Sequence, residues 1–143
     1  MNPARISRPA GIRLIEPPTL RFGGVKPSGI HHVAICVTDP DAAMEFYTGV
    51  LGLTVLPRPD FGFGGYWLDA AGQQVHLMQS EEPRPGGGHF AMRVDDLEAA
   101  VNDIRAAGWR VDTLPHMDGA GRQAFLHDPS GNQIELNQPE NGG

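Results

Sequence analysis

The sequence predicts an α+β protein built from two βαβββ modules in succession. Three observations carry this prediction: a segment repeats within the chain, each half switches between strand and helix periodicity, and turn residues separate short apolar runs. The repeat is clearest where Asp69-Ala-Ala-Gly-Gln-Gln-Val-His-Leu77 returns as Asp128-Pro-Ser-Gly-Asn-Gln-Ile-Glu-Leu136. Upstream, residues 30–37 have a counterpart at 88–94, in the same order and at nearly the same spacing. We therefore expect two copies of one supersecondary unit.

The first module opens with alternating apolar residues over 30–37, which predict a strand with one apolar face. A helix follows, because Asp39 suits the N-cap and Pro40 the first helical position. Apolar residues then recur at helical spacing until Gly52, which suits a left-handed helix end. Short strands complete the module at 53–56, 66–69 and 74–79, with a tight turn over 69–72.

The second module repeats this order. Residues 90–94 predict a strand, and the apolar spacing within 97–104 predicts a helix that ends at Gly108. Short strands follow at 110–113, 123–126 and 133–137, and the turn 128–131 joins the last two.

Length and composition fit one folded domain with a basic arm. The arm spans 1–28, the domain 29–138 with modules over 29–79 and 88–138, and a tail 139–143. The arm is net basic, whereas the whole chain of 143 residues has a net charge of −6, which disfavours nucleic-acid binding. No apolar run is long enough to span a membrane. One cysteine excludes an intrachain disulfide and no secretory signal opens the sequence, so we expect a cytoplasmic protein.

Strand alternation places four potential metal ligands on one face of the predicted sheets. The apolar side chains of each strand share one face, so His32, His76, His89 and Glu135 leave from the opposite face. They come from the first and last strands of the two copies, and a twofold relation between curved sheets would make them converge. Three imidazoles and a carboxylate suit Zn²⁺, Ni²⁺, Fe²⁺ or Mn²⁺. A lone strand histidine is usually solvated, but four candidates at repeat-related positions favour a metal site.

Other polar residues fit this pattern less well. We expect structural roles for His31, which has the parity of the apolar face, and for His116 and His127, which lie near turns. Arg93 shares the face of His89 and could equally bind an anionic substrate group or pair with an acid. We expect Cys36 to be a small buried filler rather than a reactive thiol. Roles in lining a pocket or on an ordinary surface are both open for Gln74, Met78, Asn137 and Arg122.

Residues 29–138 resemble the vicinal oxygen chelate superfamily, which includes glyoxalase I, fosfomycin-resistance enzymes, methylmalonyl-CoA epimerase, extradiol dioxygenases and bleomycin-binding proteins. The resemblance rests on His32-Val-Ala-Ile, Phe46-Tyr47 before Leu51-Gly52-Leu53, Gly88-His89-Phe-Ala and Asp128-Pro-Ser-Gly-Asn-Gln-Ile-Glu135-Leu. It implies that the two modules form a curved mixed-sheet cup and that His32, His89 and Glu135 are shared metal ligands. His76 falls on the fourth ligand position, where many isomerases and epimerases of the family have Glu or Gln. Their base chemistry therefore does not carry over unchanged.

The resemblance implies that a divalent metal chelates oxygens of a small-molecule substrate. We expect first a glyoxalase-I-like or epimerase-like isomerisation, a proton transfer next to a carbonyl with Glu135 as the proton carrier. One alternative is an extradiol-type ring-cleaving dioxygenase, in which His32, His89 and Glu135 hold non-haem iron. Addition of a thiol or water to an epoxide is also open. A non-catalytic protein that binds an antibiotic or another small ligand is the alternative of a different class. Relatives of this size are commonly homodimers, so we expect that assembly.

Overall fold

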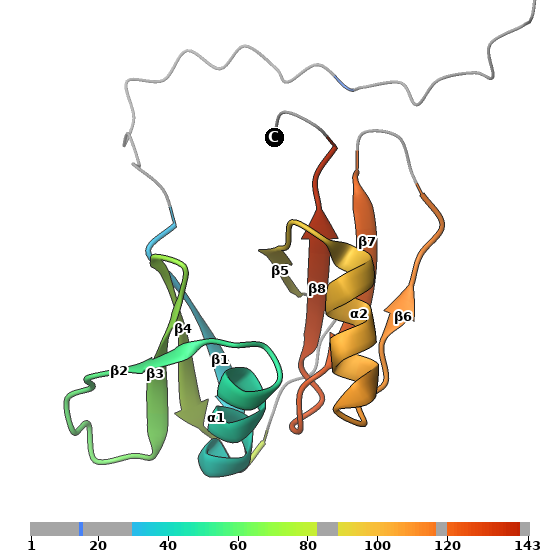
Figure 1. The fold of residues 1–143 in the computed structure, drawn as a ribbon. Coiled ribbons are helices and arrows are strands. Elements are labelled where there is room, and N and C mark those ends of the chain that lie inside the picture. The colour runs from blue at the N-terminus through green and yellow to red at the C-terminus, as the bar shows by residue number, and fades with distance from the viewer. Residues whose placement is uncertain (1–14, 16–29, 83–88, 117–119, 141–143) are drawn as a thin grey trace, which may run out of the picture.

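The computed structural model describes residue 15 and residues 30–82, 89–116 and 120–140. The first half contains β1 (His32–Val37), α1 (Pro40–Gly49), β2 (Thr54–Leu56), β3 (Gly65–Ala70) and β4 (Gln73–Gln79). The second half contains β5 (Phe90–Arg93), α2 (Leu97–Ala106), β6 (Asp112–Thr113), β7 (Arg122–His127) and β8 (Gln133–Gln138), as Figure 1 shows. The prediction of two βαβββ modules is confirmed. Apart from Ile15, the predicted arm lies outside the described residues, as does part of the tail, so the division at 1–28 and 139–143 stays a prediction.

One predicted strand is shorter than expected. The segment 110–113 contributes only Asp112 and Thr113 to β6. The carbonyl of Val111 instead accepts a hydrogen bond from the Arg105 guanidinium on α2 at 3.1 Å, and the Val111 side chain is buried in the core. Val111, an apolar residue that contributed to the predicted strand, is therefore buried in the core beside α2 rather than paired in the sheet.

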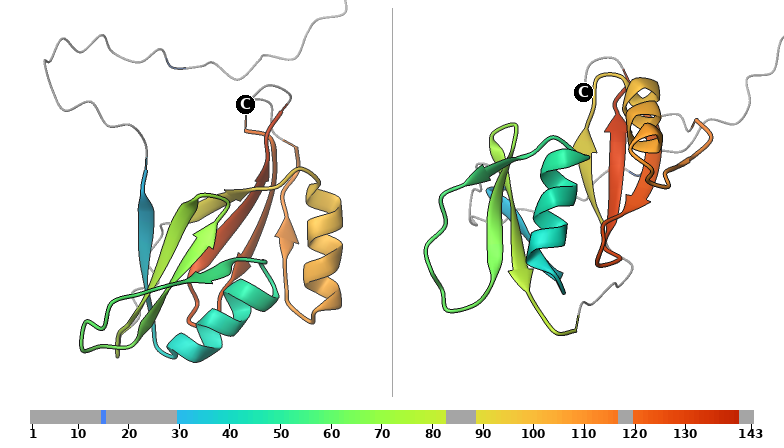
Figure 2. Two further views of the ribbon diagram at one scale, coloured as in Figure 1. Left: turned by 60° about the vertical axis from the view of Figure 1, so that its left-hand side comes forward. Right: turned by 60° about the horizontal axis from the view of Figure 1, so that its bottom comes forward.

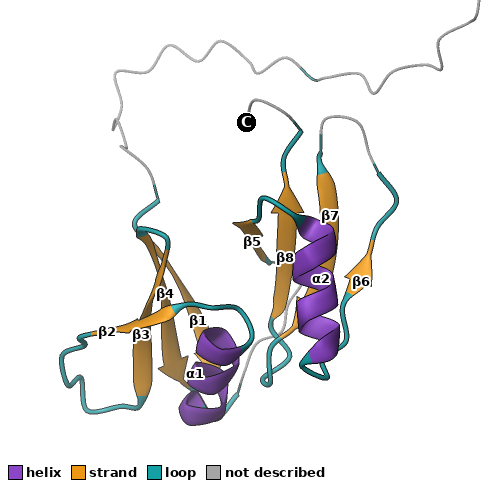
Figure 3. Ribbon diagram, viewed as in Figure 1, coloured by secondary structure: helices purple, strands orange, loops and turns teal. Residues whose placement is uncertain are grey.

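Each module contains one four-stranded mixed sheet (Figure 3). The strand orders are β1-β4-β3-β2 and β5-β8-β7-β6, so β1 and β5 are edge strands at equivalent places. The edge strand pairs in parallel with the last strand of its module, and the remaining pairs are antiparallel hairpins. The mixed sheet expected for each module is thus present in duplicate, with equivalent strand orders.

Both helices begin and end as the sequence predicts. The Asp39 carboxylate accepts from the Ala42 amide at 3.0 Å, and Asp96 repeats this cap on Ala99 at 3.0 Å. After the helices, Gly52 and Gly108 have φ values of 75° and 86°, a region that glycine adopts at little cost. Each helix then lays its apolar side against its own sheet.

Helix α1 lies between the two sheets (Figure 2). Its Phe46 ring packs 4.6 Å from Trp109, the indole that follows α2, and both belong to the continuous hydrophobic core. Since α1 covers the apolar face of the first sheet, the opposite face of that sheet points away from the second module. That opposite face is the one that carries His32 and His76.

A buried polar cluster joins the modules beside α1. The Tyr47 hydroxyl donates to Asp128 Oδ2 at 3.0 Å, and Asn132 Nδ2 donates to both Asp128 Oδ2 and the Cys36 carbonyl. The hydroxyl of Ser130 accepts from the Thr38 amide at 3.1 Å. The turn that closes the second module is therefore hydrogen-bonded to the first.

Candidate metal centre

The first predicted pair of ligands, His32 and His76, lies together on the open face of the first sheet. Their imidazole rings stack with centroids 4.1 Å apart and planes 14° from parallel. His76 is buried, at 9% exposure, whereas His32 on the edge strand is exposed. The carboxamide oxygen of Gln74 accepts a hydrogen bond from His76 Nε2 at 2.8 Å, which fixes the tilt of the ring.

The environment of His76 favours a neutral imidazole. Burial lowers the pKa of His76, and positive charge on His32, His31 and Arg58 lowers it further. Neutral imidazole is the form of histidine that coordinates a metal ion, so the lowered pKa is compatible with the predicted role of His76.

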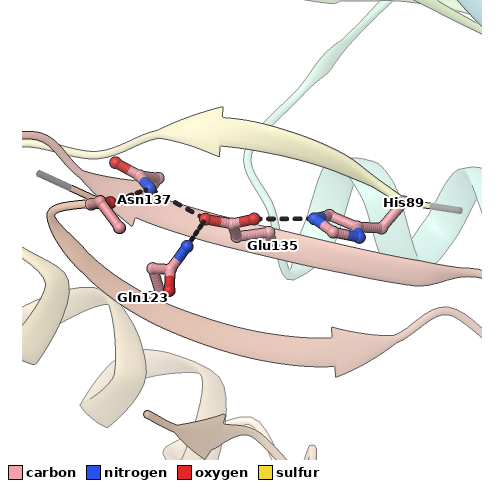
Figure 4. A network of polar contacts seen from close by, with 5 residues as sticks. His89, Gln123, Glu135 and Asn137 are labelled. Atoms are coloured by element: carbon pink, nitrogen blue, oxygen red, sulfur yellow. Dashed lines mark hydrogen bonds and ion pairs between the residues drawn. The ribbon is translucent and has the colours of Figure 1, made fainter. Parts of the chain in front are cut away.

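The second pair, His89 and Glu135, occupies the equivalent face of the second sheet (Figure 4). His89 Nε2 lies 2.8 Å from Glu135 Oε2. The other carboxylate oxygen, Oε1, accepts from Gln123 Nε2 at 2.8 Å and from Asn137 Nδ2 at 2.9 Å. Glu135 is buried, and every polar atom of its side chain is hydrogen-bonded.

These contacts keep Glu135 ionised. Burial by itself would raise the pKa of Glu135, but the hydrogen bonds from Asn137, Gln123 and His89 outweigh it and lower the pKa below its ordinary value. A carboxylate held ionised and fixed in position can bind a cation or accept a proton. The chemistry of the four donors thus fits the divalent ions that the sequence predicts.

The two pairs do not form one group within a single chain. In the described ranges, no three side chains of the types His, Cys, Asp and Glu gather closely enough to hold a metal ion. The physical reason is the position of α1, which separates the sheets so that the His32 and His76 face turns away from the second module. The four-ligand site therefore stays a prediction, and the described residues show its candidates as two contacting pairs, His32 with His76 and His89 with Glu135.

An aromatic ring that strand periodicity did not predict lies beside each pair. Trp67 on β3 stacks on His76 at 4.5 Å, and Phe125 on β7 meets the edge of His89 at 5.2 Å. Both occupy the same repeat position, and hairpin register places Trp67 opposite His76 and Phe125 opposite Glu135. Pairing the residues on either side of the turns 69–72 and 128–131, outward from each turn, would have predicted both aromatic neighbours. The same pairing would have found Gln123 opposite Asn137.

The remaining candidates have mixed outcomes. Gln74 and Asn137 contact the predicted ligands, and the histidine expected to be structural at position 31 lies beside the site, with its Nδ1 2.9 Å from His32 Nδ1. His116 pairs with Glu140 at 3.2 Å, away from both pairs. Cys36 is half-buried rather than fully buried, because the open face of β1 is uncovered there. His127, Arg93 and Arg122 are exposed and Met78 is half-buried.

Comparison with known proteins identifies the family. The model of the glyoxalase/bleomycin resistance protein/dioxygenase superfamily matches residues 29–136. A Vibrio cholerae protein named "Probable lactoylglutathione lyase" is 33% identical over 123 residues, which cover 76% of this chain and 89% of that protein. A lactoylglutathione lyase of Neisseria meningitidis is 29% identical, with 78% and 91% covered.

A solved structure agrees with this result. TnmS3, an antibiotic binding protein from Streptomyces sp. CB03234, has a TM-score of 0.70 and 28% identity, over 82% of this chain and 100% of that one. Neither helix in the described ranges is long and apolar enough to cross a membrane. With its repeat, its paired sheets and these relatives, the chain belongs to the glyoxalase/bleomycin resistance protein/dioxygenase superfamily.

Proposed function

We propose that the protein is a metal-dependent isomerase of the lactoylglutathione lyase type, which converts a hemithioacetal by moving a proton between neighbouring carbon atoms. The observation that carries this proposal is the position of Glu135, a buried carboxylate on the open face of its sheet that is held by His89, Gln123 and Asn137. The relatives named lactoylglutathione lyase support the same reaction class.

His32, His76, His89 and Glu135 would hold the divalent ion. When bound, the ion polarises the substrate oxygens and so acidifies the neighbouring C–H bond. Glu135 accepts that proton and returns it to the adjacent carbon, while the hydroxyl proton of the substrate passes from its first oxygen to the neighbouring one. Gln123 and Asn137 hold the Glu135 carboxylate in place through both steps, because each donates to the same oxygen. His76 binds as a neutral imidazole and takes no part in proton transfer, so Glu135 is the one base of the reaction.

Two copies of the chain complete the site in this proposal. His32 and His76 of one copy face His89 and Glu135 of its partner, and a twofold axis generates a second, identical site. Among the described strands β1 and β5 are edge strands of their sheets, which supports this arrangement. A cavity of about 980 Å³ is lined by His32, His89 and all four residues of β5.

Replacing Glu135 with Gln tests the reaction. The carboxamide keeps the size of the side chain but cannot accept the proton, so we expect hemithioacetal isomerisation to fall by about 100-fold or more at saturating metal. Exchange of the substrate proton into deuterated water should fall in parallel. Glu140→Gln, which removes a carboxylate outside both pairs, is the control and should retain full activity. An unchanged rate for Glu135→Gln would exclude the proposal, and oxygen uptake with a catechol would favour the dioxygenase alternative.

A further inference from the structure

A continuous series of aromatic rings leads away from the first half of the site. The Trp67 indole stacks on His76 with planes 11° apart, and His76 stacks on His32. The Trp67 centroid also lies 5.9 Å from that of Phe61, whose ring in turn stacks on Phe63 at 5.9 Å. Phe61 and Phe63 belong to the loop between β2 and β3, and their side chains are 50% and 47% exposed. Two large apolar rings are thus exposed to solvent, and Trp67 connects them to the predicted metal ligand His76.

This loop is held in place by its own backbone contacts. The Asp60 carboxylate accepts from the Gly62 amide at 2.8 Å, and Arg58 Nη2 donates to the Phe63 carbonyl at 3.1 Å. At the end of the loop, a Cβ on Gly65 would lie 2.1 Å from the Leu77 carbonyl oxygen, so only glycine permits the observed approach to β4. The exposed rings are therefore preorganised, and a ligand need not order them.

Arg58 provides positive charge at the same place. Its guanidinium lies 5.0 Å from the Phe61 centroid and 5.1 Å from the Phe63 centroid, and it is close enough to His76 to lower the pKa of that imidazole. Among the described residues Arg58 is in no ion pair with a carboxylate, and its one hydrogen bond goes to Phe63. A guanidinium without a counterion beside exposed rings suits an anionic group on an aromatic ligand.

We propose that Arg58, Phe61, Phe63 and Trp67 form a substrate-specificity subsite for a planar aromatic ring that bears an acidic group. The ring packs against Phe61 and Trp67, and the anion pairs with Arg58. This inference rests on the proposed function, because it assigns the part of the substrate that extends from the reacting carbon past His76. Substrates with small aliphatic groups would leave this subsite empty.

Ligand binding to the full chain tests the subsite without the reaction. The chain has two tryptophans, so Trp109→Phe leaves Trp67 as the only indole reporter. With a chelator present, fluorescence of this protein is titrated with benzoate, benzamide and cyclohexanecarboxylate. We expect benzoate to bind at least about tenfold more tightly than either of the others, because it alone combines the ring with the charge. Arg58→Gln should weaken benzoate by about tenfold, and Phe61→Leu by several-fold.

Controls separate this binding from binding elsewhere. Arg110→Gln removes an exposed arginine on the other module and should leave benzoate affinity unchanged. Trp67→Phe keeps an aromatic ring in the subsite but leaves Trp109 as the only indole. Benzoate should therefore bind this variant without changing the fluorescence of Trp109. Equal affinity for cyclohexanecarboxylate, or unchanged benzoate affinity in Arg58→Gln, would overturn the proposal. The proposal would also be overturned if Phe61→Leu were a monomer with unchanged benzoate affinity. The rings would then contribute to contact between two copies of the chain and not to ligand binding. Glu135→Gln should lose isomerase activity but bind benzoate as before. The proposed reaction and the proposed subsite can therefore be refuted independently of each other.

Discussion

Glu135 and His76 occupy the same position in the two modules, and their surroundings differ in kind. Glu135 is fixed by three hydrogen-bond donors, whereas His76 has one hydrogen bond to Gln74 and a ring on each side. Donors favour the charged form of a carboxylate, and apolar contact favours the neutral form of an imidazole. The repeat therefore has a carboxylate with a lowered pKa and an imidazole with a lowered pKa at matching places, the forms in which both residue types bind metal ions in general.

Removing one donor should raise the pKa of Glu135. In Gln123→Leu the carboxylate loses a hydrogen bond at Oε1 and keeps the others, so its pKa should move upward. Carbon NMR of the labelled glutamate carboxyl across pH measures this shift. Gln133→Leu changes the same strand outside the hydrogen bonds of Glu135 and should leave the titration where it was. A lower pKa in Gln123→Leu would contradict this account of the charge.

At the scale of elements, periodicity defines the face from which each side chain leaves a strand. The neighbours of that side chain on adjacent strands depend on how the strands pair. The alternation of apolar residues predicted which face each ligand leaves from, because a strand has a period of two. Gln123 and Trp67 escaped prediction because their roles depend on hairpin register, which the turns set. The strand predicted at 110–113 was too long. Val111 is buried in the core, and its carbonyl accepts a hydrogen bond from Arg105 on α2 rather than from a neighbouring strand.

Tyr47 should make stability fall at alkaline pH. Burial raises the pKa of Tyr47, and the neighbouring Asp128 carboxylate raises it further. The raised value contributes stability that is fully present below about pH 10, where the unfolded tyrosine is also protonated, and is lost as pH rises above it. Urea unfolding should show the loss, about 1.4 kcal/mol per pH unit for this group. Tyr47→Phe should lack that part of the slope, and an identical slope would refute the assignment.

Gly65 should be the most restrictive position of the β2–β3 connection. Gly65→Ala places a Cβ against the Leu77 carbonyl, so the hairpin must open or shift, at a cost of about 2–4 kcal/mol in unfolding free energy. Gly49→Ala is the matched control, because a Cβ there meets nothing within 4 Å and alanine favours the helix. Chemical denaturation of both variants measures the difference. Equal stability of the two variants would argue against the close approach.

For the whole molecule, the relation between the two sheets decides whether a site exists. The sequence predicted the duplicated fold and the sheet face of each candidate ligand, since repeat and periodicity are local properties. It could not predict that α1 lies between the sheets, because the pattern of one module contains no information on where the other one sits. Convergence of the four ligands within one chain was expected only if the sheets curved toward one another, and the described residues show two separate pairs instead.

Mixing two inactive variants tests whether copies share the site. His32→Ala with His76→Ala removes one half, and His89→Ala with Glu135→Ala removes the other. If each site combines both copies, random mixing should restore about a quarter of wild-type activity, because half of the dimers have one intact site of two. Either variant alone should stay inactive, and metal binding should recover in the same mixture. If neither activity nor metal binding recovered in the mixture, each site would have to take all of its ligands from one copy of the chain.

The cluster of Tyr47, Asp128, Ser130 and Asn132 has a consequence for a chain cut in two. Because the closing turn of one module donates to and accepts from the other, a break between β4 and β5 would leave fragments with complementary buried surfaces. Such halves, expressed separately, should reassemble noncovalently when mixed.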